Sequence, residues 1–398
     1  MSYAIGQPVL WPLPPNWATP PTEALAWLTD LQVSRNGTQQ KRQLRLAPRR
    51  LFGFAIAADA DERRLVDAIS NDQGTRQVHL PIYPDMQLLA APLAAGATSV
   101  PCTTTGYDFT AGGLAVLWAS ARQWELLSVA TVAADALTLT TATASAWPAD
   151  TRLYPVRLAR LAEPVKFTVR SDDVAEASVS LLVDEPCDWP AVAPTTLYRG
   201  VPVMDRRPNE ADAAAVSYAR TVQTVDEDAG PVTYFDYPGQ AFAGQPHTWL
   251  TVGRADHAAA RSLLYGLAGR AGQWWVPTWR ADFRLASPSA ASDSSISVEW
   301  AGYTVFGREQ VNRKDVRIVL TDGTVLLRRI LSSSEGSDTE TLTLDAPLGV
   351  DITPASVLLI SFLQMCQLAS DTVQITHVSG PDGVCTFSTV WQGVKHDV

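Results

Sequence analysis

The stretch Pro81-Ile82-Tyr83-Pro84-Asp85 has a partner later in the chain, Pro277-Thr278-Trp279-Arg280-Ala281-Asp282. Each stretch follows a helix-like segment, residues 59–70 in the first case and 256–268 in the second. Other positions match at two nearly equal offsets: Leu65, Val66 and Ile69 with Leu263, Leu264 and Leu267 and Gly74 with Gly272 at 198 residues, and Gly106-Tyr107 with Gly302-Tyr303, like Pro81 with Pro277, at 196. A register that shifts by only two residues through helix, proline and Gly-Tyr predicts an internal duplication, which determines how the rest of the chain is interpreted.

The composition bounds the class of protein. The chain has 398 residues, 46% hydrophobic and 18% charged, which is long enough for two or more domains with complete cores. These values are typical of a β-leaning globular protein and exclude a disordered one. The net charge of -10 argues against a nucleic-acid binder that relies on a general basic field. For the local basic cluster at 42–50, a solvated strand face is the favoured interpretation.

The four cysteines, Cys102, Cys187, Cys366 and Cys385, form no CxxC pair, and no histidine lies three or four residues from any of them. A zinc ribbon or a clustered iron–sulfur motif therefore lacks support. We expect reduced, buried thiols, with one long-range disulfide as the alternative.

The sequence carries no targeting or membrane signal. Its N-terminus lacks a basic segment before an apolar run, so we predict no signal peptide. The longest apolar run, 357–363, is too short to cross a bilayer. We expect a soluble protein that is not secreted by the usual route.

The chain divides into an arm and two β units. Residues 1–23 are rich in proline and tryptophan and predict an extended arm, which could pack on its own domain or on a neighbouring subunit. The first unit spans 24–183, with a hairpin at Asn36-Gly37 and a helix that begins with a capping box at Asp59 and Glu62. A linker at 184–214 leads to the second unit at 215–398, which begins with a hairpin formed by 218–225 and 232–237.

Each unit also contains an insertion. Short strand-like runs separated by Gly, Asp and Pro predict a small all-β subdomain at about 86–155 in the first unit and about 285–362 in the second. Strands at 372–378 and 385–390, around the turn Gly380-Pro-Asp-Gly, close the second unit. The predicted fold is therefore mainly β: two tandem β-sandwich-like units, each with one short helix and an inserted all-β subdomain.

The histidines provide no recognisable site. His79, His247, His257, His377 and His396 belong to no HExxH motif, and no GxSxG, GxGxxG or P-loop pattern occurs. We expect His257 to be exposed just inside its helix and His79 to lie in a strand. Nothing pairs a histidine with a nucleophile and an acid.

Two carboxylates occupy places that would suit a hydrolase pair. A glycosidase needs two carboxylates that the fold brings together, and Asp85 and Asp282 occupy equivalent places. A turn-capping aspartate is the favoured interpretation of each. The acidic turn Asp226-Glu227-Asp228 lacks the DxDxDG spacing of a calcium loop. We therefore predict no catalytic, cofactor-binding or metal-binding residues, and we expect no cofactor.

Thirteen tryptophans are the other chemical signal. Exposed tryptophans such as Trp118 or Trp300 could stack on sugar rings. Packing in cores and subunit interfaces is the favoured alternative, because aromatic residues are enriched in both.

Together, the repeated helix, the Leu80-Pro81-Ile82-Tyr83-Pro84-Asp85 and Gly272-Gln-Trp-Trp-Val-Pro-Thr-Trp279 stretches and the β insertions resemble one family. The chain resembles tail-tip (baseplate) proteins of long, non-contractile-tailed bacteriophages, in the broad distal-tail-protein group. In that group a segment rich in Gly, aromatic residues and Pro follows a helix in a β-sandwich. The resemblance covers 24–183 and 215–393 and is closer in the second unit, since Tyr83 replaces tryptophan in the first.

The resemblance implies a structural role and no catalytic residues. It implies a ring component of the virion tail tip, assembled in the host bacterial cytoplasm, that joins the tail tube to the central hub and fibres, with the tape-measure protein as a further candidate partner. Tubes of this family are six-fold and hubs trimeric, so three copies with two similar units each would form a trimeric ring with pseudo-six-fold character. We expect neither nucleic-acid specificity nor membrane insertion. The alternatives are a carbohydrate-binding virion module and, in the enzyme class, a cell-wall or capsule glycan hydrolase.

Overall fold

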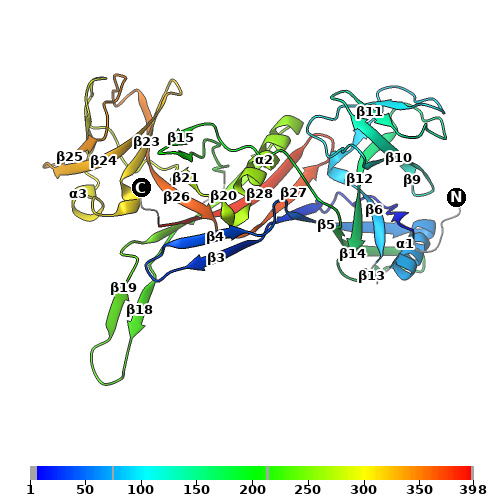
Figure 1. The fold of residues 1–398 in the computed structure, drawn as a ribbon, viewed down its shortest axis with the longest axis horizontal. Coiled ribbons are helices and arrows are strands. Elements are labelled where there is room, and N and C mark those ends of the chain that lie inside the picture. The colour runs from blue at the N-terminus through cyan, green and yellow to red at the C-terminus, as the bar shows by residue number, and fades with distance from the viewer. Residues whose placement is uncertain (1–6, 74–75, 212–214, 396–398) are drawn as a thin grey trace.

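The computed structural model describes residues 7–73, 76–211 and 215–395. Of the positions named above, Gly74 and His396 lie outside the described residues. The chain is mainly β, as predicted, and elongated, with the two insertions toward opposite ends of its long axis (Figure 1).

One row of eight antiparallel strands runs through both units. Its order is β13 (Lys166–Val169), β14 (Val174–Val183), β5 (Arg49–Asp59), β2 (Thr22–Ala26), β27 (Thr372–Ser379), β28 (Val384–Gly393), β20 (Phe242–Thr251) and β17 (Ser217–Ala219). Side chains alternate between a buried and a more exposed face along the six inner strands, as a half-buried sheet requires, whereas the end strands β13 and β17 are mostly exposed. The first four strands belong to the first unit and the last four to the second.

The two units have the same topology. In the first, β5 leads into α1 (Ala60–Gln73), then β6 (Gln77–Pro81), and the chain returns through β12 (Arg152–Leu161) to β13 and β14. In the second, β20, α2 (Arg254–Leu267), β21 (Trp274–Pro277), β26 (Val357–Leu368), β27 and β28 follow in the same order. The pairing register of the return strand also agrees between the units. In the first unit Val156 pairs with Pro81 and Ala159, three residues on, pairs with Val183; in the second Leu363 pairs with Pro277 and Cys366, three residues on, pairs with Gly393.

Positive φ angles recur at two corresponding places. The chain enters each helix through a residue with positive φ, Ala60 at 37° and Gly253 at 91°, although the Gly253 ψ of 155° lies outside the left-handed helical region. The glycine of each Gly-Tyr pair also has a positive φ, 80° at Gly106 and 71° at Gly302. The duplication inferred from sequence is therefore present in topology, register and backbone.

Strand β2 belongs to both units at once. On one edge it pairs with β5 of the first unit, and on the other it pairs with β27 of the second. Leu25 of β2 is fully buried and packs in the core of the second unit, although β2 stands in the row with the strands of the first unit. The two sandwich-like units are thus fused edge to edge.

The insertions each have their own core and share a strand with their unit. The first contains β7 (Gln87–Leu88), β8 (Ser99–Pro101), β9 (Leu114–Ser120), β10 (Gln123–Val132) and β11 (Ala136–Leu139). The second contains β22 (Ser295–Glu299), α3 (Tyr303–Phe306), β23 (Asp315–Leu320), β24 (Val325–Glu335) and β25 (Thr339–Leu344). β12 pairs with β9 at one end and β6 at the other, and β26 joins β23 to β21 in the same way. Each return strand therefore continues from the insertion into the sandwich.

The N-terminal arm packs on its own chain. β1 (Val9–Leu10) pairs in parallel with β6, and Trp11 and Leu13 are buried in the first core. The Tyr83 hydroxyl donates a hydrogen bond to the Leu13 carbonyl over 2.8 Å. Of the two alternatives for the arm, the structure has the one in which the described part of the arm packs on its own unit.

Both predicted hairpins are confirmed. β3 (Thr29–Val33) and β4 (Gln39–Gln43) turn at Gly37, and β18 (Val222–Val225) pairs with β19 (Thr233–Asp236). The β18–β19 hairpin projects away from the body of the molecule (Figure 1). Between the units, the linker forms a small hairpin, β15 (Leu197–Tyr198) with β16 (Val201–Pro202), and buries Cys187 in the first core and Met204 in the second.

The shared strand β2 gives the first prediction. Ala24→Pro should lower the free energy of unfolding by about 3 kcal/mol or more, because proline removes one ladder hydrogen bond from a strand that is paired on both edges. Ala24→Thr keeps the N–H and should change that free energy by less than about 1 kcal/mol. Urea denaturation of both variants would measure the difference, and equal stabilities would contradict the bridging role of β2.

Candidate functional site

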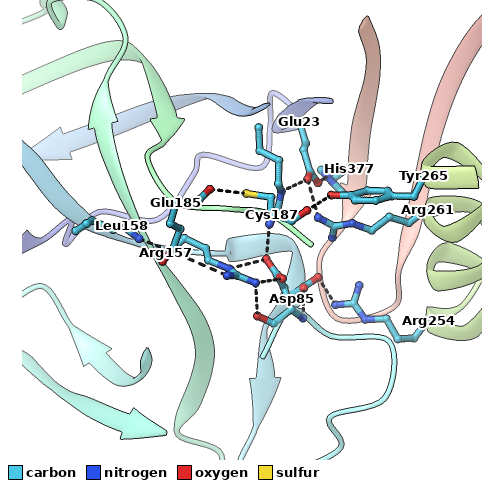
Figure 2. Close-up of polar contacts among 12 residues, drawn as sticks. Glu23, Asp85, Arg157, Leu158, Glu185, Cys187, Arg254, Arg261, Tyr265 and His377 are labelled. Atoms are coloured by element: carbon cyan, nitrogen blue, oxygen red, sulfur yellow. Dashed lines mark hydrogen bonds and ion pairs between the residues drawn. The ribbon is translucent and has the colours of Figure 1, made fainter. Parts of the chain in front are cut away.

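The densest group of functional side chains is a buried network of charges where the two units meet. Arg50 donates from Nε to Glu23 Oε1 over 2.7 Å and pairs on its other side with Asp108. Arg261 donates to the same Glu23 oxygen over 3.1 Å, and Arg157 Nε donates to Asp108 over 3.2 Å. Figure 2 shows Glu23, Arg157 and Arg261, which come from both units, within this network.

The secondary structure explains why these charges point inward. Arg50 stands on β5 in the same alternating register as Phe52 and Phe54, so its side chain enters the core and is 0% exposed. Glu23 lies opposite Phe52 in the neighbouring strand and faces the same side. Arg261 lies on the buried face of α2 with Leu264, one helical turn away.

Asp85 forms a second branch of the network. Its carboxylate accepts the Asp108 N–H over 2.8 Å and an Arg254 N–H over 2.6 Å. Arg254 belongs to α2, and its guanidinium also lies 4.0 Å from the centre of the Tyr107 ring. The first Pro-Asp motif and the first Gly-Tyr pair therefore both bind the helix of the second unit.

Asp282, the counterpart of Asp85, has a local role. Its carboxylate accepts the Phe362 N–H over 2.9 Å and also bonds the Thr278 hydroxyl. That contact matches the predicted bracing of a turn, whereas Asp85 connects two units. The two carboxylates bind different partners, and they do not face each other as the carboxylates of a hydrolase would.

The network holds its charges by mutual compensation. Burial raises the pKa of Glu23, but Arg261 and Arg50 outweigh it and hold that pKa well below its usual range. Burial likewise opposes ionisation of Asp108, yet Arg50 and Arg157 lower its pKa to about 2. Both carboxylates are therefore charged at neutral pH and hold no proton that they could transfer. The arrangement joins strands and a helix of the two units and is not suited to acid–base catalysis.

Two histidines complete the network, and one expectation about them was wrong. His257 is buried, not exposed, because it lies on the same face of α2 as Arg261. Burial, His377 and Arg254 lower its pKa to about 2, so its ring stays neutral. His377 Nε2 lies 3.2 Å from Glu23 Oε2, which brings a strand of the second unit to the same carboxylate.

A separate cavity of about 320 Å³ opens at the far end of the second unit. Among its lining residues are Asn209, Glu210, His247, Thr278 and Trp279. Glu210 is paired with Arg207, and His247 packs its ring against Trp249, with burial lowering its pKa to about 4. A neutral, ring-packed histidine and an ion-paired glutamate form no catalytic pair.

The other candidate residues divide between core and surface. Cys102, Cys187, Cys366 and Cys385 are all free thiols, and the last three are buried. Trp274, Trp275 and Trp147 are buried, as the packing interpretation predicts. Of the two tryptophans considered for sugar stacking, Trp300 is 53% exposed, whereas the ring of Trp118 is half-buried with the Arg152 guanidinium 5.1 Å from its centre.

Sequence reasoning missed the network, although a signal existed. The basic cluster at 42–50 was expected to form a solvated face, which holds for Arg42 and Arg49 but is wrong for Arg50. Arg50 and Glu23 each occupy a position that the strand alternation assigns to the core. A charge in the apolar phase of a strand is the pattern that predicts a buried ion pair.

The network gives a prediction of stability. Arg50→Met should lower the free energy of unfolding by about 3–5 kcal/mol, because it leaves Glu23 and Asp108 buried with less compensating charge. Arg42→Met, at an exposed position of the same cluster, should change it by no more than about 0.5 kcal/mol. Urea denaturation would measure both, and similar values would contradict the network's role.

The buried histidines predict a two-stage loss of stability in acid. Unfolded histidine takes up a proton below pH about 6.5, whereas folded His257 stays neutral until about 2, so stability should fall from pH about 6.5 downward by up to about 1.4 kcal/mol per pH unit. Below about pH 4 the depressed pKa of Glu23 adds a second loss, since that contribution exists only while its carboxylate is charged. His257→Gln should flatten the first stage in denaturation curves measured from pH 7 to 4. An unchanged slope would contradict this assignment.

Within 7–73, 76–211 and 215–395, no three His, Cys, Asp or Glu side chains gather as metal ligands would. No helix in that part of the chain is both long enough and apolar enough to cross a membrane. No protein-family model matches the sequence, and no curated protein matches it.

Proposed function

We propose that the chain is a structural protein of a bacteriophage tail tip, a ring component that joins the tail tube to the central hub and fibres. Three copies would form the ring, each supplying two similar units. The proposal combines the family resemblance of the sequence with one structural observation, the edge-to-edge fusion of two four-stranded modules.

The fusion supplies a template for contact between copies. Inside the chain, β2 at the edge of the first module pairs with β27 at the edge of the second. The counterparts of these strands are β17 and β13, which form the two ends of the eight-stranded row. Among the described residues, no second strand pairs with either of them. A β17–β13 contact between copies would repeat the internal junction and is heterologous, so it can close a ring.

Hydrogen-bonding groups at the β13 edge are placed for such a contact. The Arg170 N–H donates to the Val174 carbonyl over 2.8 Å, so by antiparallel alternation the Val169 N–H points away from β14. The counterpart of Val169 is His377. Val169 lies opposite Ala175, the second residue of β14, and His377 lies opposite Cys385, the second residue of β28. At the internal junction the His377 N–H donates to the Pro21 carbonyl over 2.8 Å.

One face of the row also suits the inside of a ring. The residues that point away from the core near the module junction are mostly small or uncharged, among them Thr22, Ala24, Gly53, Ala55, Gln374 and Thr376. The partly buried Leu51 and the exposed Val378 are single large apolar side chains on the same face. Single apolar side chains on a surface need no covering layer, so this face can stand open to water in a lumen.

The ring is tested by the mass of the purified protein in solution. We expect a trimer, and Val169→Pro should weaken it by removing the outward N–H, while Val169→Thr should not. Val169 is 64% exposed, so neither change should alter the stability of the monomer by more than about 0.5 kcal/mol.

Six copies would refute the trimer and leave the tail role intact, whereas a monomer at all concentrations would overturn the ring. The tail role has its own test. Antibodies to the chain should label the tip of the tails of intact virions, and virions without label would overturn that role.

A further inference from the structure

We propose that the β18–β19 hairpin is a docking arm whose acidic tip binds the basic surface at the base of the β3–β4 hairpin in a second copy of this chain. This inference deepens the proposed ring and rests on it. The tip consists of Asp226, Glu227 and Asp228, and the basic surface of Arg42, Arg45 and Arg49.

The internal junction shows what the counterpart hairpin does. β3–β4 leads into β5 as β18–β19 leads into β20, so the two hairpins occupy equivalent places. The β3–β4 hairpin belongs to the first unit but lies on the second. Its first strand is bound there by Asp371, which accepts the Thr29 N–H over 2.9 Å, and by Arg270, which donates to the Thr29 carbonyl over 3.2 Å.

The tip of β3–β4 reaches the base of the next hairpin. A Cβ placed on Gly37 would lie 2.9 Å from Phe242 Cζ and 3.6 Å from Pro238 Cβ, so the turn is in contact with the start of β20. Phe242 is the first residue of β20, and Arg49 is the first residue of its counterpart β5. If copies repeat the internal junction, the β18–β19 tip meets the residues just before and at Arg49 in the next copy.

The charges of these two surfaces are complementary. Asp226, Glu227 and Asp228 are all exposed at the tip of a hairpin that projects from the body (Figure 1). Arg42 and Arg49 are exposed, and Arg45 is half-buried, where it donates to the Ala26 carbonyl over 3.2 Å. The internal contact, in contrast, is made by an uncharged Asn36-Gly37 turn against a phenylalanine and a proline. Among the described residues the acidic tip and the basic surface form no ion pair with each other within one chain, so we assign their complementarity to a contact between copies.

Exposed apolar side chains accompany the charges on both surfaces. Leu46 is 92% exposed beside Arg45, and Leu44 is also exposed. On the arm, Tyr234 and Phe235 are exposed, and the Phe235 ring stacks on Tyr237 with 5.9 Å between ring centres. A two-stranded hairpin with apolar residues open to water is only marginally stable alone, and a second copy would cover both sets.

Charge reversal in the full-length protein tests the contact. The triple variant Asp226→Lys, Glu227→Lys and Asp228→Lys places like charges together and should raise the dissociation constant of the oligomer about tenfold or more. Adding Arg42→Glu and Arg49→Glu to the same chain should restore association, because each copy then offers a basic tip and an acidic base. A matched control with the same change in net charge, Glu299→Lys, Glu309→Lys and Asp322→Lys on the second insertion, should associate as the unmodified chain does.

The results separate this inference from the ring itself. Trimers that form equally well with the reversed tip would overturn the docking arm and leave the ring standing. Failure of the Arg42 and Arg49 reversals to restore association would also overturn it, since the tip would then bind a different surface of the second copy. An unmodified chain that remains monomeric at every concentration would overturn the ring and the contact together. Thermal unfolding of each variant should match the unmodified chain, because all the altered side chains are exposed.

Discussion

Glu23 is the side chain on which the arrangement of the two units depends. It sits in β2 with almost no exposure to water, and its charge is compensated by Arg50 from the first unit and Arg261 from the second. Neither arginine can move away without leaving an ion buried and poorly compensated, which costs several kcal/mol. The β2–β27 ladder sets the register of the two units along one edge. A carboxylate shared by both units restricts their packing further, so we expect the network to contribute more to the specificity of the junction than to net stability.

The two copies of the unit have diverged at the same structural position. Arg157 on β12 and Gln364 on β26 are counterparts, since each follows the residue paired with the motif proline by one place. Arg157 binds Asp108 within the junction network, whereas Gln364 accepts an amide N–H from Gln245 over 2.9 Å near the open cavity. The charged version faces a fixed partner inside the chain. The neutral version lies at the free end, where a buried charge would have no such partner.

The sequence predicted the architecture better than the polar junction. Helices, hairpins and several strands follow from local periodicity, and the duplication follows from a register carried by few residues, so these could be identified. Insertion limits were harder, because β12 and β26 are continuous strands in which no turn marks the change from insertion to sandwich. The fusion through β2 could not be predicted, since the pairing of Leu25 with Val373 joins the two ends of the chain. Burial of His257 was missed because a polar residue just inside the start of a helix was expected to face water, whereas a polar cluster occupies part of the buried face of α2.

The double pairing of β2 also has a consequence for the order of synthesis. β5 emerges soon after β2, but β27 emerges only when nearly the whole chain has been made. At about 5–20 residues per second, the second edge of β2 waits on the order of tens of seconds without its native partner. During that time the nascent chain presents an open strand edge of the same kind as the β13 and β17 edges of the finished protein. Nascent chains on neighbouring ribosomes of one mRNA could pair through this edge before β27 is made. The yield of the fused fold would then depend on slow release from the ribosome or on a chaperone that covers the edge.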